Sequence, residues 1–509
     1  MKPISQVVVL GGGSAGMLAA ITLRVRLPQL GVRVLRSPTL GVIGVGEGST
    51  PDFPRHLHSY LGIDPGEFLR RVRPSWKLGI RFEWGSRLDH FNYGFHPAFA
   101  DRLRDEETPA GAGLGYVVGD ERYNYHDNVS SLMEAGKVFG RNEQGIQMHA
   151  ATGYHIENED LVAWLESHAA AVGVEILDGD LGEAEPGGDG LAAIRTTDGR
   201  RLEADLFIDA SGFRAELIGK AMGEPLVSYR DSLFCDRALV GGWDREPGDP
   251  VLPYTTATTM DHGWCWRIDH HDRVHRGYVF SSAFVSDAEA ERELRALEPR
   301  MGPVRPVPFV SGRRRRQWAG NVFAVGNAAG FVEPLEATSL LVICNELRNL
   351  AGVLADSACA PTPGLRETCN RFCADAWDEI RDFLAIHYRF NGRKETPFWR
   401  ACRADTALHA AEAVVAFYRE NGPSMLAAPE LLRPRQAIFG LPGYLNLLVG
   451  QGVPHGRGDL RTPALARLWE RYSAANAEAA ARGATIEEAF PLACDPSFRW
   501  PRGFYGNAG

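Results

Sequence analysis

Long apolar runs are missing from the 509 residues, and none reaches the roughly 18 residues that a membrane-spanning helix needs. The N-terminal segment also lacks the long apolar stretch and cleavage site of a signal peptide. Hydrophobic residues make up 44% of the chain and charged residues 23%, which is ordinary for a globular protein. We therefore expect a cytoplasmic protein with no membrane partner.

An excess of positive charge is also missing. The formal net charge is −9 at pH 7, whereas a nucleic-acid partner usually requires a basic face. The four arginines at 313–316 are too short a run to change this expectation, and they indicate a solvated turn. We expect no nucleic-acid partner.

Cysteine is sparse and irregularly spaced. The eight cysteines form no CxxC pair, and Cys369 and Cys373 have no second pair of ligands close to them in the sequence. Zinc sites and disulfide frameworks usually show such regular pairs. The pattern predicts reduced thiols and no metal site.

Glycine, in contrast, is plentiful, and its first cluster follows a strand. A valine-rich run at 6–10 predicts a buried strand, residues 15–26 a helix and residues 32–35 a second strand. The GxGxxG loop at 11–16 lies between the first strand and the helix, the context that raises this motif above chance. This order predicts an α/β fold that opens with a Rossmann-type dinucleotide-binding unit.

The residues of this loop have separate roles. Gly11 permits the tight turn, Gly13 lets the backbone approach a pyrophosphate, and Gly16 allows the helix to pack closely on the strand. Ser14 and Ala15 begin the helix, whose free N–H groups and partial positive charge attract phosphate. We interpret the loop as a phosphate site; a purely structural turn is the alternative.

The acidic residue that usually binds the ribose is missing. It should follow about 20 residues after the loop, where this chain has Arg36. Arg36 is either a surface residue or part of an altered adenosine pocket, and such a pocket could accept the 2′-phosphate of NADP. No second GxGxxG loop occurs in the chain.

The remaining pattern mixes strands and helices. Hydrophobic periodicity and turn residues predict these further elements: a helix over 62–80 broken at Pro74, a helix over 160–172, strands over 174–177, 191–197 and 206–208, antiparallel strands within 254–284, a buried strand over 321–325, and mainly helices from 363 onward, including 404–419.

Five segments together resemble the flavin-dependent halogenases of the tryptophan-halogenase type. They are the GxGxxG loop, GVGEGSTP at 44–51, WKLGIRF at 76–82, GWCWRI at 263–268 and GNAAGFVEPLE at 326–336. One such segment would be weak evidence, but five in the family's order are strong, and the likeness runs from residue 7 to about 339. It implies an FAD-binding domain of the flavin monooxygenase type, an antiparallel substrate-side sheet and a mainly helical C-terminal part.

The resemblance also implies a chemistry. In that family, reduced FAD and O2 oxidise a halide to hypohalous acid. Lys77 matches the active-site lysine, whose ammonium hydrogen-bonds the hypohalous acid or forms a haloamine and aims the halogen at a carbon; a lone helix lysine would otherwise extend to solvent. Glu336 matches the glutamate that polarises this group and takes the ring proton. A helix N-terminus would also favour such a carboxylate.

Thr338 and Ser339 fall at the family's halide contacts. Well-known members read Glu-Ser-Thr-Gly, whereas this chain reads Glu336, Ala337, Thr338, Ser339. The serine side chain crowds a place built for glycine and changes the size of the site. We expect bromide as the halide, with chloride as the alternative.

Trp264 and Trp266 match the motif thought to keep the substrate away from the flavin, and Asp269 replaces the proline that ends it. Two tryptophans at this spacing could equally form a packed pair on a strand. Outside the phosphate loop, the resemblance implies these cofactor contacts: Arg36, Glu47, Gly326, Asn327, Pro334 and Leu340.

We expect a halogenase core over 1–360, with substrate-facing insertions at about 85–150 and 225–310. The helical region 361–509 should pack on it and close the substrate chamber. Family substrates are electron-rich aromatics, and the residues that could enclose one are Phe91, Tyr93, Phe95, His96, Trp399, Phe439 and Tyr444, each of which could also be ordinary packing. Free tryptophan is unsupported; indole-like, phenolic, peptide and carrier-bound substrates stay open.

Three functions are compatible with these residues. The first is a two-component halogenase that receives FADH2 from a separate NAD(P)H-dependent flavin reductase and uses O2, halide and a small aromatic substrate. The second is a flavin-dependent hydroxylase, which Lys77 and the two tryptophans disfavour. The third is a flavin-binding protein without halogenating activity; four departures from the family pattern keep it open, namely Arg36, Asp269, Ala337 and Ser339. The unusual adenosine end predicts weakly held FAD, and a homodimer stays open.

Overall fold

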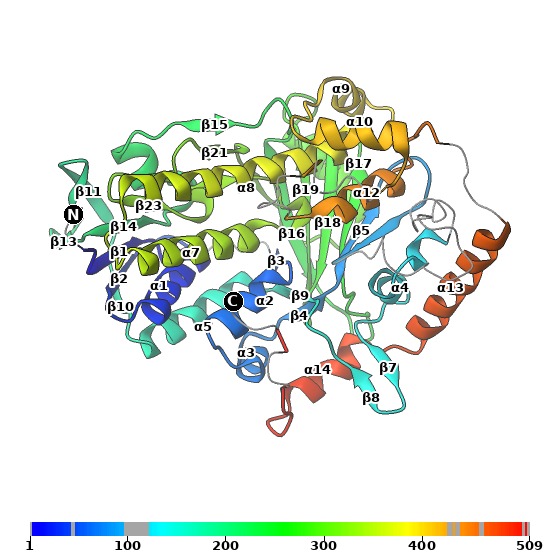
Figure 1. Ribbon diagram of the computed structural model, residues 1–509, viewed down its shortest axis with the longest axis horizontal. Helices are drawn as coiled ribbons and strands as arrows, with labels where there is room; N and C mark the ends of the chain where they lie inside the picture. Colours follow the sequence, from blue (N-terminus) through cyan, green and yellow to red (C-terminus); the bar gives the residue numbers. More distant parts are fainter. Residues whose placement is uncertain are drawn as a thin grey trace.

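The computed structural model describes residues 3–41, 46–95, 122–424, 431–432, 438–457, 463–500 and 504–505. His96 and the start of the segment at 44–51 lie outside these residues. Figure 1 shows one sheet with its helices at one end of the molecule, a second, larger sheet in the middle, and C-terminal helices against that second sheet. The two sheets provide the two sides of the candidate site.

The first sheet has six strands in the order β10-β2-β1-β14-β23-β22, and all its neighbours are parallel except β22 and β23. This confirms the predicted dinucleotide-binding architecture. The strands are β1 (Gln6–Leu10), β2 (Gly31–Arg36), β10 (Glu175–Asp178), β14 (Leu206–Asp209), β22 (Trp318–Ala319) and β23 (Val322–Ala324).

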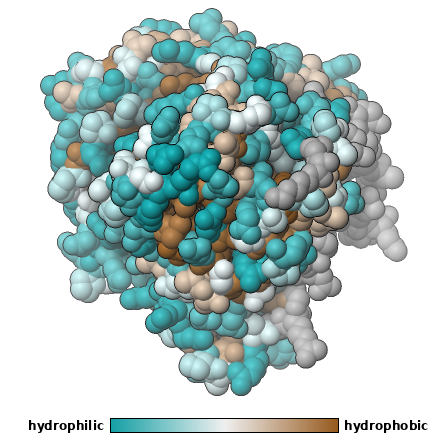
Figure 2. All heavy atoms as spheres, turned by 90° about the vertical axis from the view of Figure 1, so that its left-hand side faces the viewer, coloured by the Kyte–Doolittle hydropathy of each residue, from teal (hydrophilic) through white to brown (hydrophobic). Residues whose placement is uncertain are grey.

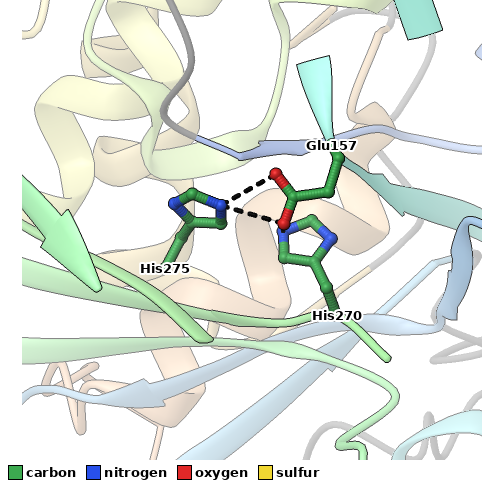
Figure 3. A group of neighbouring side chains, drawn as sticks. All are labelled: Glu157, His270 and His275. Carbon is green, nitrogen blue, oxygen red and sulfur yellow. Dashed lines mark hydrogen bonds and ion pairs between the residues drawn. The ribbon is translucent and has the colours of Figure 1, made fainter. Parts of the chain in front are cut away.

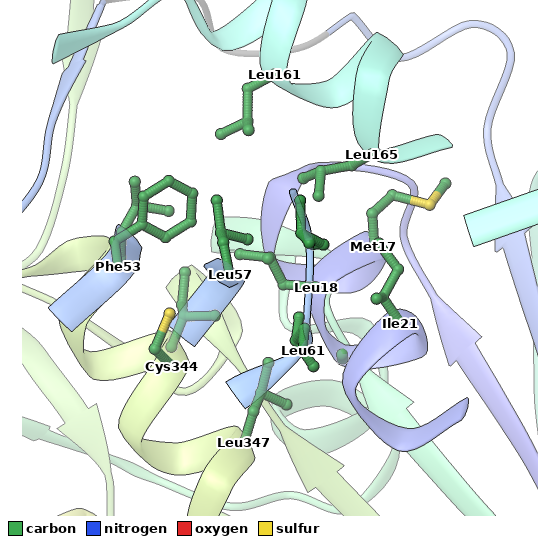
Figure 4. Packing of buried hydrophobic residues seen from close by; sticks show 14 of the residues in the cluster. Met17, Leu18, Ile21, Phe53, Leu57, Leu61, Leu161, Leu165, Cys344 and Leu347 are labelled. Atoms are coloured by element: carbon green, nitrogen blue, oxygen red, sulfur yellow. The ribbon is translucent and has the colours of Figure 1, made fainter. Parts of the chain in front are cut away.

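Helices α1 (Ser14–Arg26), α5 (Asn158–Ala171) and α7 (Ser339–Asp356) pack together beside this sheet. Their apolar faces meet those of α2 (Asp52–Arg55) and the helical turn that follows it. Figure 4 shows part of this core: Met17, Leu18, Ile21, Phe53, Leu57, Leu61, Leu161, Leu165, Cys344 and Leu347. The core fixes the N-termini of α1 and α7, which both point to the candidate site.

The second sheet has seven strands in the order β20-β16-β19-β18-β17-β5-β6, antiparallel throughout except for the parallel pair β17 and β5. It confirms the predicted antiparallel sheet. The strands are β5 (Gly79–Glu83), β6 (Phe91–Gly94), β16 (Arg237–Asp244), β17 (Thr255–Met260), β18 (Gly263–Asp269), β19 (Arg273–Phe280) and β20 (Arg305–Pro308).

A three-stranded sheet connects the two parts. It consists of β3 (Glu47–Gly48), β9 (Gly153–Ile156) and β4 (Ser75–Lys77), with β9 in the middle. The predicted helix over 62–80 is therefore wrong in its second half. Helix α3 (Pro65–Val72) ends at Arg73, whose φ is +50°, and Pro74 cannot continue a helix. The segment after Pro74 pairs with β9 as β4 and then joins the second sheet as β5.

The smaller elements are these: β7 (Gly140–Asn142), β8 (Gly145–Gln147), β11 (Leu181–Gly187), β12 (Gly190–Thr196), β13 (Arg201–Glu203), β15 (Leu226–Ser228), β21 (Gly312–Arg314), β24 (Gly330–Phe331), α4 (Asn128–Glu134) and α6 (Asp287–Leu297). The run at 313–316 is thus not a solvated turn throughout, because Arg313 lies on β21 and pairs with Asp378, while Arg316 pairs with Glu224.

The C-terminal part is helical, as expected. Its helices are α8 (Pro363–Phe390), α9 (Pro397–Asp405), α10 (Ala411–Asn421), α12 (Gly440–Gly450), α13 (Pro463–Ala481) and α14 (Ile486–Cys494). The single helix predicted over 404–419 is divided between α9 and α10, because Thr406 is extended and His409 has a φ of +47°. Helices α8, α9, α10, α12 and α13 contribute to one apolar core with the second sheet, in which Phe82, Trp264 and Leu384 are fully buried. Helix α14 packs into the first core instead.

All eight cysteines are free thiols, and seven of them are buried. Figure 2 shows the end of the molecule that carries the first sheet, where hydrophilic atoms predominate and hydrophobic atoms gather in a central band. In the part of the chain that the structure describes, no helix is long and apolar enough to span a membrane.

Candidate active site

The phosphate loop has the shape expected of a pyrophosphate cradle. Gly11 has a φ of +123°, and a Cβ on Gly16 would lie 2.0 Å from the carbonyl oxygen of Gly11. A Cβ on Gly13, in contrast, would meet nothing within 4 Å. Gly13 precedes α1, and no side chain caps the first turn at Ser14 and Ala15. Free N–H groups therefore face open space, which suits a dinucleotide phosphate.

Arg36 lies at the end of β2, close to this loop. Its guanidinium contacts the carboxylates of Glu166 at 2.5 Å and Asp178 at 2.6 Å. Hydrogen bonds to Asp178 and Glu166 raise the already high pKa of Arg36. A 2′-phosphate would have to displace two carboxylates that already satisfy this arginine, so the geometry disfavours the NADP pocket considered above. A Cβ on Gly12 would lie 2.5 Å from Cβ of Arg36, so the arginine side chain packs directly against the loop.

Lys77 ends β4 and is fully buried. Its Nζ has no hydrogen-bond partner among the described residues and lies 5.7 Å from the ring centre of Phe95. A Cβ on Gly48 would lie 3.0 Å from Nζ of Lys77 and 3.5 Å from Cβ of Ala337, which places the lysine beside the 336–338 turn. Burial lowers the pKa of Lys77 to about 7, although the charge of Glu336 opposes this shift.

Glu336 is the last residue of a helical turn, Pro334–Glu336, and is 3% exposed. Burial raises its pKa, while His387 and Lys77 oppose the increase. Nε2 of His387 lies 2.7 Å from Oε1 of Glu336, and Nδ1 of the same ring lies 3.1 Å from the carbonyl oxygen of Phe383. The carbonyl only accepts, so Nδ1 carries a proton, and the short Nε2–Oε1 contact requires one further proton between the two groups.

His387 is a residue that the sequence motifs missed. It lies on α8, 51 positions beyond Glu336, and its side chain is fully buried. A single histidine in an amphipathic helix carries little information by itself. The only sequence signal is that His387 follows Phe383 by one helical turn, so both residues face the same way.

The proposed halide contacts lie at the start of α7. Thr338 is buried, Ser339 is exposed, and no side chain caps this helix N-terminus. Ala337 has a φ of +54°, a left-handed conformation that non-glycine residues rarely adopt. Thr338 and Ser339 line one small pocket together with Gly326 and Asn327. A helix N-terminus at this place favours an anion.

Of the other predicted cofactor contacts, Gly326 and Asn327 line this pocket, whereas Glu47, Pro334 and Leu340 do not. A Cβ on Gly326 would lie 2.8 Å from Cβ of Ala15, so its loop contacts the phosphate helix. Glu47 is half-buried and accepts a hydrogen bond from Asn158, and burial raises its pKa. Pro334 is exposed. Leu340 has its side chain fully buried in the first core, which leaves only its backbone available to a cofactor.

Trp264 and Trp266 stand side by side on β18, with ring centres 6.1 Å apart. Trp264 donates a hydrogen bond from Nε1 to Glu333, 2.9 Å away, and Tyr388 donates to the same carboxylate. Burial raises the pKa of Glu333 to about 7, although these two hydrogen bonds oppose the shift. A Cβ on Gly277 would lie 2.1 Å from the ring of Trp266. Packing therefore fixes both indoles, as the interpretation of a packed pair on a strand predicts.

Asp269, at the place of the missing proline, is 1% exposed and pairs with Arg267 at 2.9 Å. Its carbonyl oxygen accepts a hydrogen bond of 2.9 Å from the hydroxyl of Ser75, two positions before Lys77. This backbone hydrogen bond connects the tryptophan strand to the lysine strand, and it does not depend on the side chain at position 269.

Apart from Phe95, which lies near Lys77, the described candidate substrate aromatics divide into two groups. Phe91 and Trp399 are fully buried, and Trp399 donates its Nε1–H to the carbonyl of Met260, so both are core residues. Tyr93, Phe439 and Tyr444 instead gather around Phe383: Phe439 stacks on it with ring centres 3.7 Å apart, and Tyr444 lies at 5.0 Å. The charge of Glu336 acts on the hydroxyl of Tyr93, whose pKa burial raises well above its usual value. This second group adjoins the Glu336–His387 pair.

A dinucleotide cradle, a sequestered lysine beside a buried carboxylate and a packed pair of tryptophans together match what is expected of a flavin-dependent halogenase. The comparisons with known proteins support this class. The model of the tryptophan halogenase family matches residues 6–464. The chain belongs to this family; it is an enzyme that uses FAD. Flavin-dependent halogenases need a separate flavin reductase, a halide, O2 and an aromatic substrate.

Individual relatives are similar over most of their length. Tryptophan 6-halogenase ThaL of Streptomyces albogriseolus is 34% identical over 429 residues, 78% of each chain. Tryptophan 7-halogenase RebH of Lentzea aerocolonigenes is 31% identical over 428 residues, again 78% of each. The solved structure of MibH, a lanthipeptide tryptophan 5-halogenase, has a TM-score of 0.87 at 39% identity and covers 97% of this chain and 94% of its own.

Proposed function

We propose that this enzyme brominates the indole ring of a tryptophan-type substrate, with Lys77 directing hypobromous acid and Glu336 accepting the ring proton. The observation that carries the proposal is the buried Nζ of Lys77, which has no hydrogen-bond partner in the described part of the chain and lies in the field of the buried Glu336. A buried ammonium without a hydrogen-bond partner lowers the stability of the folded protein, and such groups occur at functional sites. We therefore infer that Lys77 hydrogen-bonds a small molecule that binds transiently during the reaction.

The cofactor end of the site fits FAD. The uncapped N-terminus of α1 and the open space at Gly13 would hold the pyrophosphate, and the loop at Gly326 and Asn327 would lie beside it. When bound in its reduced form, FAD supplies the oxidation of halide by O2 to hypohalous acid. We propose that an NAD(P)H-dependent reductase provides the reduced cofactor.

Lys77 would act as an acid toward hypohalous acid. Its ammonium donates a hydrogen bond to the oxygen of HOBr, and as the carbon–bromine bond forms, its proton passes to that oxygen and water leaves. The pKa of about 7, which burial causes, leaves both protonation states accessible at neutral pH. The bromine then reaches only a ring carbon placed beside Nζ.

Glu336 would complete the substitution. The ring carbon that gains bromine loses its proton to the Glu336 carboxylate, and transfer of that proton to Lys77 restores both groups. The overall reaction is ArH + HOBr → ArBr + H2O, which balances. His387 acts on Glu336 and not on the substrate: its hydrogen bond of 2.7 Å fixes the carboxylate and shares one proton with it.

The N-terminus of α7 would bind the halide. The serine at 339 in place of glycine supports bromide, since the site differs in size from that of the well-known members, and bromide is also the easier halide to oxidise. Thr338 would supply a hydroxyl or a backbone N–H to the anion. Chloride remains the comparison ion for the experiment.

The substrate proposal rests on two observations. The aromatic group of Tyr93, Phe439 and Tyr444 adjoins Glu336 and is suited to a flat, electron-rich ring. Relatives with substantial identity are named tryptophan halogenases, and MibH is named a lanthipeptide tryptophan 5-halogenase. Because α12 contributes Phe439 as its N-terminal cap and Tyr444 from its interior, the helical C-terminal part would close the chamber.

One assay tests these points. The purified chain is incubated with FAD, a flavin reductase, NADH, O2 and either bromide or chloride, with free tryptophan, indole or a tryptophan-containing peptide as substrate. A product with the bromine isotope pattern supports the proposal. A product heavier by one oxygen would instead identify a hydroxylase, and flavin binding without any product would identify a protein that no longer halogenates.

A further inference from the structure

The end of the second sheet carries a cluster of metal-binding side chains outside the site described above. Glu157 follows β9, His270 follows β18, and His275 lies on β19. Figure 3 shows the three side chains pointing toward one another, and their ligand atoms all lie within 4.8 Å of each other. The two histidines belong to one hairpin, whereas Glu157 lies 118 positions before His275, so the sequence spacing does not reveal the cluster.

The distances within this cluster suit a metal ion. Nε2 of His275 lies 3.0 and 2.9 Å from the two oxygens of Glu157, and Nε2 of His270 lies 3.7 Å from Oε1 of the same carboxylate. Zinc bound tetrahedrally at about 2.0–2.1 Å from each ligand requires separations of roughly 3.3 Å between ligand atoms. The observed values lie on both sides of this figure, so small side-chain movements would complete the site.

His270 provides the second, independent observation. It is 4% exposed, and within the described residues its Nε2 has no hydrogen-bond partner although it faces the Glu157 carboxylate. Burial lowers the pKa of His270 to about 3, against the opposing charge of Glu157, so the ring is neutral at physiological pH. A neutral, unsatisfied imidazole nitrogen is the ligand form that a transition metal needs.

Glu157 supplies the negative charge and the entry route. Burial would raise the pKa of Glu157, but the hydrogen bond from His275 and the positive charge of Arg273 help to lower that pKa overall. Its side chain is about one-quarter exposed, whereas those of His270 and His275 are 5% and 11% exposed. A cation can therefore reach the carboxylate from solvent and then displace the His275 hydrogen bond.

We propose that Glu157, His270 and His275 bind one divalent transition-metal ion, with Zn²⁺ as the best-fitting cation. Two imidazoles and one carboxylate form a ligand set that zinc accepts with a fourth position open to water. Mg²⁺ prefers a shell of oxygen ligands and is a poor match.

A bound metal ion would restrain the backbone at Gly46 and Glu47, beside the proposed cofactor site. A Cβ on Gly46 would lie 2.8 Å from Cδ2 of His275 and 2.9 Å from Nε2 of His270, so the backbone at Gly46 covers the imidazoles. Asn158, next to Glu157, donates a hydrogen bond to Glu47. A bound ion would cross-link the β18–β19 hairpin to the start of α5 and hold the Gly46–Glu47 backbone between them.

Calorimetric titration of the chelator-treated full-length protein with ZnCl2 tests the site. The wild type should bind one Zn²⁺ per chain, should give visible absorption bands with Co²⁺ in its place, and should not bind Mg²⁺. Saturating Zn²⁺, at about 100 times Kd, should raise the midpoint of thermal unfolding by about 3 °C. His270→Gln and Glu157→Gln should each weaken Zn²⁺ binding at least about tenfold.

His262→Gln is the matched control. His262 also faces a carboxylate, with Nδ1 3.7 Å from Glu293, but the described residues offer it no second histidine. This variant should bind Zn²⁺ as the wild type does. His270→Gln removes no hydrogen bond made by Nε2, and its unfolding midpoint without metal shows whether it is folded. Absence of stoichiometric binding by the wild type, or unchanged binding by folded His270→Gln, would overturn the proposal. Neither outcome bears on halogenation, which is measured separately.

Discussion

The two ends of the candidate active site are built by different means. The cofactor end consists of backbone: Gly11, Gly13 and Gly16 shape a loop whose free N–H groups face open space. The chemical end consists of buried side chains, where Lys77 and Glu336 keep charges out of water. A backbone cradle binds its ligand without perturbing any pKa, whereas the chamber depends on perturbed pKa values.

This difference separates binding from reaction. Changes in the cradle should weaken affinity for FAD but leave the reaction of bound FAD intact. Changes in the chamber should leave FAD bound but stop transfer of the halogen to the substrate. FAD affinity and product formation are therefore the two quantities that distinguish the two ends of the site.

Lys77→Ala should have the largest effect. We expect halogenated product to fall by at least about 10²-fold, because no other described group with an N–H occupies the place of Nζ. Oxidation of reduced FAD by O2 should continue, and FAD affinity should change less than about twofold. Mass spectrometry of the product and the absorbance of FAD measure the two. Lys220→Ala, at an exposed lysine paired with Glu216, is the control. Substantial bromoindole formation by Lys77→Ala would show that another group directs the halogen.

Glu336→Gln should lower the rate of product formation by about 10²-fold, since the amide cannot accept the ring proton. His387→Gln should cost less, about tenfold, because it removes only the partner that fixes the carboxylate. The pH dependence of kcat distinguishes a proton-sharing role from a structural one: His387→Gln should shift the profile, while a packing defect would lower it uniformly. Equal rates for Glu336→Gln and the wild type would remove Glu336 from the reaction.

Gly13→Ala tests the cradle. Its added methyl group would meet no protein atom but would enter the space assigned to the pyrophosphate. We expect Kd for FAD, measured by fluorescence titration, to rise about tenfold, with an unchanged unfolding midpoint and unchanged product per bound FAD. Gly352→Ala, on α7 and equally free of contacts, should leave Kd unchanged. An unaltered Kd in Gly13→Ala would mean that FAD does not lie against this loop.

The pH profile should report Lys77 directly. Burial lowers the pKa of this ammonium to about 7, so the protonated fraction falls as the pH rises through that value. If the ammonium directs the halogen, product per FAD oxidised should fall about fivefold between pH 7 and pH 8. The same ratio rising over this interval would instead identify the neutral amine, and hence a haloamine, as the active form.

Ser339→Gly should have the smallest effect. Removing the hydroxymethyl group restores the glycine of the well-known members at the start of α7 and enlarges the room for the anion. We expect the ratio of chlorinated to brominated product, measured in equal concentrations of the two halides, to change about two- to threefold. A ratio that does not move would show that position 339 has no part in choosing the halide.

The cofactor end could be predicted from sequence because its determinants are local. A strand, three glycines and a helix lie within residues 6–26, and the positive φ of Gly11 and the close approach of Gly16 follow from this short segment. The pairing of Arg36 was not predictable in this way, since Glu166 and Asp178 join it only through the folding of α5 and β10.

The chemical end depended on resemblance and was predicted less completely. Lys77 was assigned from its motif, but its segment was expected to be a helix. The segment is a strand because it pairs with β9, more than 70 positions away, and this pairing is not visible in the local sequence. His387 has only one weak local signal, its spacing of one helical turn from Phe383. The sequence also did not show which aromatic residues line the substrate chamber. It could not distinguish Trp399, which is a core residue, from Phe439, which stacks beside the site.

The backbone conformation of Ala337 lowers the stability of the protein but helps to position the proposed catalytic carboxylate. Its left-handed backbone, with a φ of +54°, costs about 1–2 kcal/mol for a residue that carries a Cβ. A glycine at position 337 would relieve this strain. It would also allow the backbone next to Glu336 to adopt other conformations, in which the Glu336 carboxylate points elsewhere. Selection for heat resistance alone would therefore act against the rigidity that holds this carboxylate in place.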